Sequence, residues 1–142
     1  SGPALEIAKA NALLNDFTGK HKTIVGDAFE EMEILARERT EFDIVVIDPP
    51  SFAKSAIEVD RAINSYKRLA NLGLKLVKRG GTLVLASCSS RVTSDVFFDL
   101  MEEVMQTAKV NYKVLATTKH DTDHPIGFKE GAYLKSIYIQ IN

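Results

Sequence analysis

The stretch IVVIDPPSFAK, residues 44–54, decides the fold of this chain. Its first four residues are β-branched and apolar, which predicts a strand buried in a parallel sheet. That strand ends at Asp48, which is followed by Pro49 and Pro50. Proline has no N–H for the sheet ladder and keeps the preceding residue extended. An acid is therefore held at the carboxyl end of a strand, where open α/β sheets bind their ligands.

The composition is that of one globular domain. The chain has 142 residues, and 45% of them are apolar, which is enough for a hydrophobic core. Its 18 basic and 19 acidic residues exclude a strongly basic nucleic-acid-binding domain. A single cysteine excludes an intrachain disulfide and a cysteine-rich zinc site. The sequence shows no membrane-spanning run and no signal peptide, so we expect a soluble, cytoplasmic protein that does not enter a membrane.

Helical and strand patterns alternate along the chain. Apolar spacing predicts helices at residues 4–16, from Asp27 through Leu35, at 59–78 and at 94–108. Runs of β-branched and apolar residues predict strands at 23–26, 42–47, 82–86, 112–118 and 133–141. Asp27 and Glu30 fit a capping box, and Gly80-Gly81 fits a left-handed cap after the third helix. The loop 120–131 is long enough to suspect a function.

The order of these elements predicts the fold class. Three strand–helix units follow the first helix, and such alternation is typical of an α/β protein with a parallel, doubly wound sheet. The last two strands have no helix between them, so we expect them to pair antiparallel at one edge. All 142 residues then belong to one domain.

Three groups of residues resemble S-adenosylmethionine-dependent RNA methyltransferases. They are DPPSF at 48–52, SCS at 87–89, and HP at 124–125 with EGAYLKS at 130–136. The closest resemblance is to the large-subunit ribosomal RNA cytosine-C5 methyltransferases, and it covers nearly the whole chain. It implies a Rossmann-like class I methyltransferase fold with an antiparallel C-terminal hairpin, S-adenosylmethionine as cofactor and ribosomal RNA as substrate.

The chain departs from that family in its cofactor motifs. The family has a glycine-rich turn after its first strand and a ribose-binding acid after its second, and this chain contains no Gly-x-Gly. We therefore expect the chain to be the C-terminal part of a methyltransferase catalytic domain whose first two strands are missing, and to be inactive alone. Open strand edges recruit other chains. We expect either direct pairing of strands 23–26 and 42–47 or an edge-to-edge homodimer.

Cys88 is the candidate nucleophile. Carbon 5 of cytosine is a poor nucleophile, and a thiolate that adds to carbon 6 makes carbon 5 enamine-like, so that it can attack a methyl donor. The alternative is a buried cysteine that acts as a small apolar residue, which is the commoner fate of a single cysteine. The strand-exit position and the flanking serines favour the nucleophile.

The resemblance assigns the Asp48 loop to the substrate and to the cofactor. Asp48 would hydrogen-bond the amino edge of cytosine, and Pro49 and Pro50 would keep the loop rigid. The alternative, an acid that caps the next helix, would not need two prolines. Phe52 would stack on a flipped base or pack in the core. Lys54 would contact phosphate or the base, or remain solvated.

Asp27 also ends a predicted strand. In the methyltransferase fold an acid there meets the adenine amino group of the cofactor, and Ala28 and Phe29 would line the ring. The capping box is an equally good explanation, and one acid can serve both roles.

The remaining polar groups give weaker signals. His120, Asp121, Asp123 and His124 lack a thiol partner and helical histidine spacing, so we reject a metal site. The basic residues that could follow an RNA path, or simply face solvent, are Arg61, Lys67, Arg68, Arg91 and Lys129.

Three functions remain open at this point. The first is methylation of cytosine carbon 5 in ribosomal RNA through a Cys88 adduct. The second is methylation of an exocyclic RNA nitrogen, in which the Asp-Pro-Pro loop accepts hydrogen bonds from the amine and Cys88 is structural. The third is that this chain by itself is a non-catalytic half domain.

Overall fold

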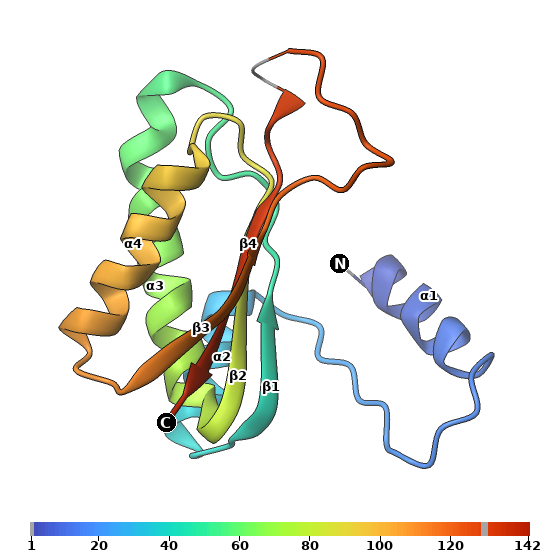
Figure 1. The fold of residues 1–142 in the computed structure, drawn as a ribbon. Coiled ribbons are helices and arrows are strands. Elements are labelled where there is room, and N and C mark those ends of the chain that lie inside the picture. The colour runs from blue at the N-terminus through green and yellow to red at the C-terminus, as the bar shows by residue number, and fades with distance from the viewer. Residues whose placement is uncertain (1, 129–130) are drawn as a thin grey trace.

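The computed structural model describes residues 2–128 and 131–142. It contains one four-stranded sheet in the order β1-β2-β4-β3 (Figure 1). The strands are β1 (Phe42–Ile47), β2 (Val77–Ser87), β3 (Tyr112–Thr118) and β4 (Lys135–Ile141). The helices are α1 (Gly2–Ala12), α2 (Ala28–Arg37), α3 (Val59–Leu76) and α4 (Ser94–Thr107), with a 3-10 turn η1 (Ala56–Glu58) before α3.

The strand pairing confirms the predicted α/β class. β1 and β2 are parallel, with Ile47 opposite Leu85. β2 and β4 are antiparallel, with Ser87 opposite Lys135, and β3 pairs antiparallel with β4 as the predicted C-terminal hairpin. The carboxyl ends of β1 and β2 therefore lie side by side, next to the amino end of β4.

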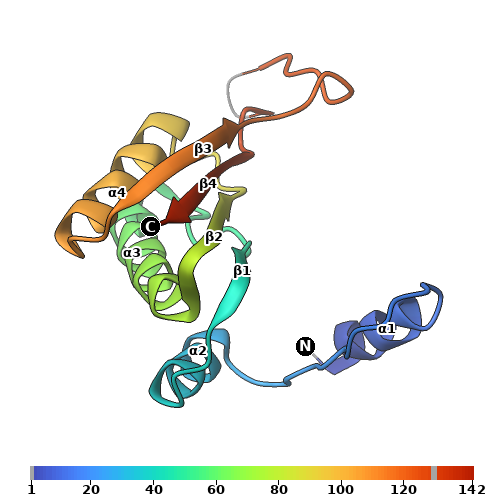
Figure 2. The ribbon, with the colours of Figure 1, turned by 60° about the horizontal axis from the view of Figure 1, so that its bottom comes forward.

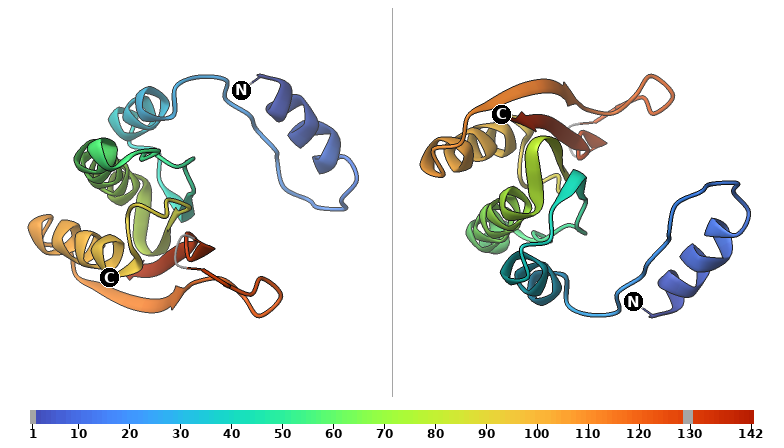
Figure 3. Two further views of the ribbon diagram at one scale, coloured as in Figure 1. Left: turned by 90° about the horizontal axis from the view of Figure 1, so that it is seen from above. Right: turned by 90° about the horizontal axis from the view of Figure 1, so that it is seen from below.

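Three helices cover one face of the sheet. Figures 1 and 3 show α2, α3 and α4 on the same side, with α3 in the middle. Their apolar faces pack on the inward side chains of the strands, which include Val45, Ile47, Leu83 and Leu85. α3 approaches β1 and β2 closely at Gly73, where a Cβ would lie 2.7 Å from Leu83 Cδ1.

The other face of β1 is bare, which corrects the expectation of a fully buried strand. Ile44 and Val46 are 65% and 64% exposed, whereas Val45 and Ile47 are buried. Side chains alternate between the two faces of a strand. Only the residues that point towards α3 are therefore covered.

The segment 23–26 is not a strand, which is a second correction. It runs extended but has no partner in the sheet, and β1 occupies the edge of the sheet order. The expected direct pairing with β1 therefore does not form. A strand needs a neighbouring strand for its backbone hydrogen bonds. The apolar composition of residues 23–26 does not provide that neighbour. The edge-to-edge homodimer stays a prediction.

Several helix boundaries differ from the predicted ones, most clearly those of the first and third helices. The first helix spans residues 2–12 rather than 4–16, and the third ends at Leu76 rather than 78. Val77 already pairs with Phe42 of β1, which stops α3. Gly80 has a φ of 81°, but it lies in an irregularity of β2 and does not cap α3.

α1 stands apart from the sheet. Figures 2 and 3 show it separated from the other helices by a long connecting segment. None of its described residues is buried. Among the described residues, no helix combines the length and the apolar character needed to cross a membrane.

Replacing Gly81 by alanine should destabilise the start of the sheet. A Cβ on Gly81 would lie 2.7 Å from the Asp43 carbonyl and 2.9 Å from the Lys78 carbonyl. Backbone atoms cannot move aside as a flexible side chain does, so we expect a loss of about 1–3 kcal/mol in the free energy of unfolding. Urea denaturation measures it. The control is Gly127→Ala, whose Cβ meets nothing within 4 Å and should leave stability unchanged.

Candidate active site

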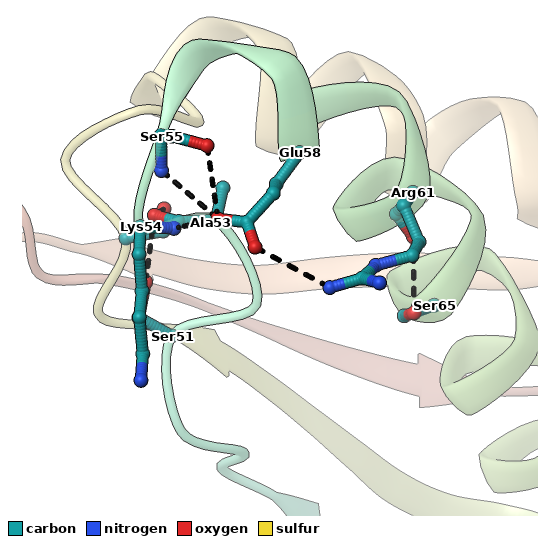
Figure 4. Close-up of polar contacts among 8 residues, drawn as sticks. Ser51, Ala53, Lys54, Ser55, Glu58, Arg61 and Ser65 are labelled. Atoms are coloured by element: carbon teal, nitrogen blue, oxygen red, sulfur yellow. Dashed lines mark hydrogen bonds and ion pairs between the residues drawn. The ribbon is translucent and has the colours of Figure 1, made fainter.

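The Asp-Pro-Pro loop follows β1 directly and is closed by Glu58. The Glu58 carboxylate accepts hydrogen bonds from the backbone N–H of Lys54 at 2.8 Å and of Ser55 at 3.0 Å (Figure 4). These bonds, the Ser55 hydroxyl and the Arg61 charge hold the pKa of Glu58 below its usual value. The loop is therefore a fixed turn between β1 and α3.

One hollow of about 440 Å³ joins the two predicted acids. Asp27 and Asp48 both line it. Most of the remaining lining is apolar, which is typical of a pocket for a ring system with a few polar anchors. The other lining residues are Ala28, Phe29, Met32, Val46, Ile47, Pro49, Pro50, Phe52 and Leu69.

Asp27 is the N-cap of α2, as predicted. Its Oδ1 accepts from the backbone N–H of Phe29 at 2.9 Å and of Glu30 at 3.3 Å. Within the described residues, the Glu30 carboxylate makes no return bond, so only half of the expected capping box forms. The cap uses one carboxylate oxygen, and the exposed carboxylate still borders the hollow.

Phe52 serves the core and the hollow together. Its ring is half-buried and lies edge-on to Tyr66, with centroids 5.1 Å apart, and 6.3 Å from the Phe29 ring. Tyr66 in turn packs on Phe97 at 5.4 Å. An aromatic chain thus runs from the hollow into the core and leaves one side of Phe52 at the lining.

Cys88 lies next to the Asp-Pro-Pro loop. It directly follows the last residue of β2 and is half-buried. Its Sγ is 3.9 Å from the Pro49 carbonyl oxygen. Its two flanking serines are buried. Ser87 Oγ is hydrogen-bonded to Tyr66 OH at 2.8 Å, and the Ser89 hydroxyl lies 3.5 Å from the Ala53 carbonyl that it donates to. The serines thereby tie the β2 exit to α3 and to the neighbouring loop.

Negative charge at the site affects Tyr66. Burial raises the pKa of the Tyr66 hydroxyl, and the hydrogen bond to Ser87 acts against this. Charge on Cys88 and Asp48 adds to the increase in the Tyr66 pKa. Tyr66 is therefore a neutral group beneath the two strand exits.

Lys135 is the residue that the sequence prediction missed. It is fully buried at the start of β4, and its ammonium donates to the backbone carbonyls of Ser89, Val92 and Tyr133. Burial lowers the pKa of Lys135 to about 8, and charge on Cys88 acts in the opposite direction. The sequence did contain a sign of this burial. Lys135, Ile137 and Ile139 are alternate residues of one strand, so their side chains point to the same buried face.

The predicted RNA-path residues on α3 are engaged in ion pairs. Lys67 pairs with Glu103 of α4 at 2.7 Å, and Arg68 pairs with Glu33 of α2 at the same distance. The Arg68 guanidinium also lies 4.6 Å from the centroid of the Phe29 ring. These contacts join helices and need no RNA to explain them.

Of the other basic residues singled out in the sequence, those that the structure describes do not line the hollow. Lys54 and Arg91 are exposed, Arg61 pairs with Glu58 at 3.4 Å, and Lys129 lies outside the described residues. Lys54 contributes a backbone hydrogen bond to the loop but does not line the hollow. Its predicted contact with substrate stays a prediction.

The histidines of the β3–β4 loop stack on one another. The rings of His120 and His124 are 4.6 Å apart and nearly parallel, and Tyr133 lies edge-on to His120. His120 Nε2 accepts from the Leu134 backbone N–H at 3.0 Å, so that nitrogen is occupied. The described residues contain no group of three or more His, Cys, Asp or Glu that could hold a metal ion.

Similar proteins cover this chain over almost its whole length. No family model matches it. A ribosomal RNA large subunit methyltransferase of Deinococcus radiodurans is 34% identical over 143 residues, 100% of this chain and 35% of that protein. The ribosomal RNA large subunit methyltransferase I of Alteromonas mediterranea is 31% identical over 144 residues, 99% of this chain and 36% of that protein. The chain thus spans about a third of the length of these relatives.

A solved structure decides the fold. The crystal structure of SMU.776, a proposed methyltransferase complexed with SAH, matches with a TM-score of 0.76 and 24% identity over 96% of this chain and 35% of that chain. This chain has a methyltransferase fold. Asp27 and Asp48 line one hollow, and Cys88 lies beside the Pro49 carbonyl at the end of β2.

The buried Lys135 predicts a specific pH dependence of stability. Its pKa is about 8 when folded and 10.5 ordinarily, so between these values the unfolded chain binds more protons. The contribution of Lys135 to the free energy of unfolding therefore rises as pH increases through this window. Each unit of pKa difference is worth about 1.4 kcal/mol, so we expect a gain of about 2 kcal/mol between pH 7.5 and 10 relative to Lys135→Met.

Urea denaturation of both proteins at each pH measures this difference and cancels the titration of other groups. Lys113→Met, at an exposed position of β3, is the matched control and should track the wild type at every pH. A constant difference between wild type and Lys135→Met would contradict the prediction.

Proposed function

We propose that this chain forms part of the catalytic domain of an S-adenosylmethionine-dependent methyltransferase that modifies ribosomal RNA. The observation that carries the proposal is the hollow bordered by Asp27 and Asp48, with Cys88 beside Pro49, one of its lining residues. The names of the relatives, which are large-subunit ribosomal RNA methyltransferases, support the substrate class. The SAH complex of the structural neighbour supports the cofactor class.

The hollow fits the adenine end of the cofactor. The Asp27 carboxylate can accept a hydrogen bond from an exocyclic amine, and Ala28 and Phe29 offer an apolar wall to a ring. S-adenosylmethionine supplies an electrophilic methyl group when it is bound. The glycine turn and the ribose acid of the family are absent from this sequence. We infer that another part of the domain holds the ribose and the methionine moiety.

Cys88 would act as the nucleophile in a cytosine-C5 reaction. Its thiolate would add to carbon 6 of the base, and the electron pair would move to carbon 5, which would take the methyl group as the bond between that group and its sulfonium sulfur breaks. A base then removes the carbon-5 proton, and the carbon–sulfur bond breaks to return the thiolate. The position of Sγ next to the Asp-Pro-Pro loop, 3.9 Å from the Pro49 carbonyl oxygen, supports this role.

Asp48 would orient the cytosine. It is exposed at the end of β1 and borders the hollow, so its carboxylate can accept from the amino edge of a base above the loop. Pro49, Pro50 and the Glu58 bonds limit the motion of the loop. Phe52 offers its uncovered side to a flipped base.

Methylation of an exocyclic nitrogen is the second candidate. The observation that favours it is the same Asp48-Pro49-Pro50 turn, whose carboxylate and carbonyl oxygens can accept from an amine. In that reaction the contact of Cys88 with the Pro49 carbonyl is packing only.

Replacing Cys88 separates the two reactions. In the complete methyltransferase of which we propose this chain to be part, Cys88→Ala should lower the rate of methyl transfer by at least about 10³-fold, because no nucleophile remains to activate carbon 5. Mass spectrometry of the product nucleoside should show 5-methylcytidine. Full activity of Cys88→Ser, or an N-methylated product, would sink the cytosine-C5 mechanism.

The chain alone should bind S-adenosylmethionine weakly. Without the glycine turn and ribose acid we expect a Kd on the order of millimolar, measured by calorimetry. Amide chemical shifts of Phe29 and Asp48 should move on titration. Asp27→Asn should weaken the effect, since asparagine keeps the helix cap but replaces an acceptor oxygen by an amide donor. Micromolar affinity would contradict the proposal that this chain holds only the adenine end of the cofactor.

A further inference from the structure

A buried ammonium joins three segments around Cys88. Lys135 is 0% exposed, and its Nζ donates to the carbonyls of Ser89 and Val92 in the β2 exit and of Tyr133 before β4. An ammonium has three donors, so these carbonyls use all of its hydrogen-bonding capacity. Lys135 therefore has no proton to exchange with a substrate without breaking one of these bonds.

The bonded carbonyls define the path of the chain after Cys88. Ser87, just before Cys88, is opposite Lys135 in the sheet register, and Ser89 and Val92 lie after it. The ammonium thus closes the turn 89–92 onto the start of β4. The Ser87 and Ser89 side chains are held on the buried side by Tyr66 and the Ala53 carbonyl. Cys88 is left facing the Pro49 carbonyl.

A purely structural role does not account for a lysine at this position. Burial of a charge lowers stability unless its contacts compensate, and an apolar residue of similar length often serves a core better. The lowered pKa of Lys135 shows that burial is not fully compensated. The ammonium nevertheless sits within the electrostatic reach of Cys88, whose charge raises the Lys135 pKa.

The charges around Cys88 explain what a cation would contribute. Asp48 at the neighbouring strand exit is an anion, and it disfavours a second negative charge nearby. Tyr66, which is hydrogen-bonded to Ser87, is an uncharged hydroxyl, and burial raises its pKa further. Charge on Cys88 contributes to the pKa shifts of two groups, Tyr66 and Lys135. Of these two, Lys135 is the one that carries a positive charge. Coupling between two charges is reciprocal, so a thiolate that favours the ammonium is itself favoured by it.

We propose that Lys135 is a positioning residue for Cys88, because its ammonium closes the turn after Cys88 and supplies the positive charge that favours the thiolate. This inference rests on the proposed role of Cys88 as a nucleophile. It assigns to Lys135 the task of offsetting the charge of Asp48 while the thiol is ionised. It also gives a reason for a buried cation next to the strand exits.

Alkylation of Cys88 tests the proposal without methyl transfer. Cys88 is the only cysteine of the chain, so iodoacetamide reports on it alone. The thiolate sulfur forms a bond to the acetamide carbon, and iodide leaves, so the rate follows the thiolate fraction. At pH 7.5 we expect Lys135→Met to react about tenfold more slowly, with its rate-versus-pH curve displaced to higher pH. Lys135→Arg should remain within about threefold of the wild type.

Two controls separate this effect from loss of structure. Lys113→Met removes an exposed lysine of β3 and should leave the alkylation rate unchanged. In 6 M guanidinium chloride, about the concentration that unfolds even very stable proteins, all variants should react equally. A folded Lys135→Met protein that reacts as fast as the wild type, or faster because the turn has opened, would overturn the proposal.

A second measurement applies even where Lys135→Met does not fold. The Nζ resonance of Lys135 in isotopically labelled protein reports its titration, and Cys88→Ala should lower the Lys135 pKa because the opposing charge is gone. An unchanged titration would refute the coupling. The outcome is independent of the proposed reaction, since loss of methyl transfer in Cys88→Ala tests the nucleophile and the two titrations test Lys135.

Discussion

The parallel pairing of β1 with β2 is the constraint on which the site depends. With Ile47 opposite Leu85, the two strands end at the same edge of the sheet. Asp48 then follows one strand and Cys88 the other, and Sγ comes within 3.9 Å of the Pro49 carbonyl. A shift of this register by one residue would turn the inward side chains outward and separate the two exits. The register therefore specifies the core and the site together.

The strand exits are held from two directions. From the helix side, Tyr66 of α3 is hydrogen-bonded to Ser87, and the close approach of Gly73 lets α3 lie directly on β1 and β2. From the hairpin side, Lys135 bonds the carbonyls that follow Cys88. The bare face of β1 has no such support, and Ile44 and Val46 remain exposed there. The covered face thus holds the two strand exits in place.

Individual elements show why the sequence predicted some features and not others. The strands at 42–47 and 112–118 were predicted with their observed bounds, because each is a local apolar run with a partner in the sheet. The run at 23–26 has similar composition but no partner, and it forms no strand. The helix predicted to residue 78 ends at Leu76, since pairing of Val77 with Phe42 competes with the helix. Asp27 was recognised as a cap because capping chemistry is local.

By itself, the sequence determined the α/β class, the antiparallel final hairpin and the acid and cysteine at consecutive strand ends. These follow from short-range patterns of apolar residues, prolines and caps. Only the tertiary structure decided that Asp27 and Asp48 border one hollow and that the Lys135 ammonium reaches the turn after Cys88. Such contacts join residues far apart in the chain, here Lys135 and Ser89, and depend on register and on how far a side chain reaches. A local pattern carries no information about either.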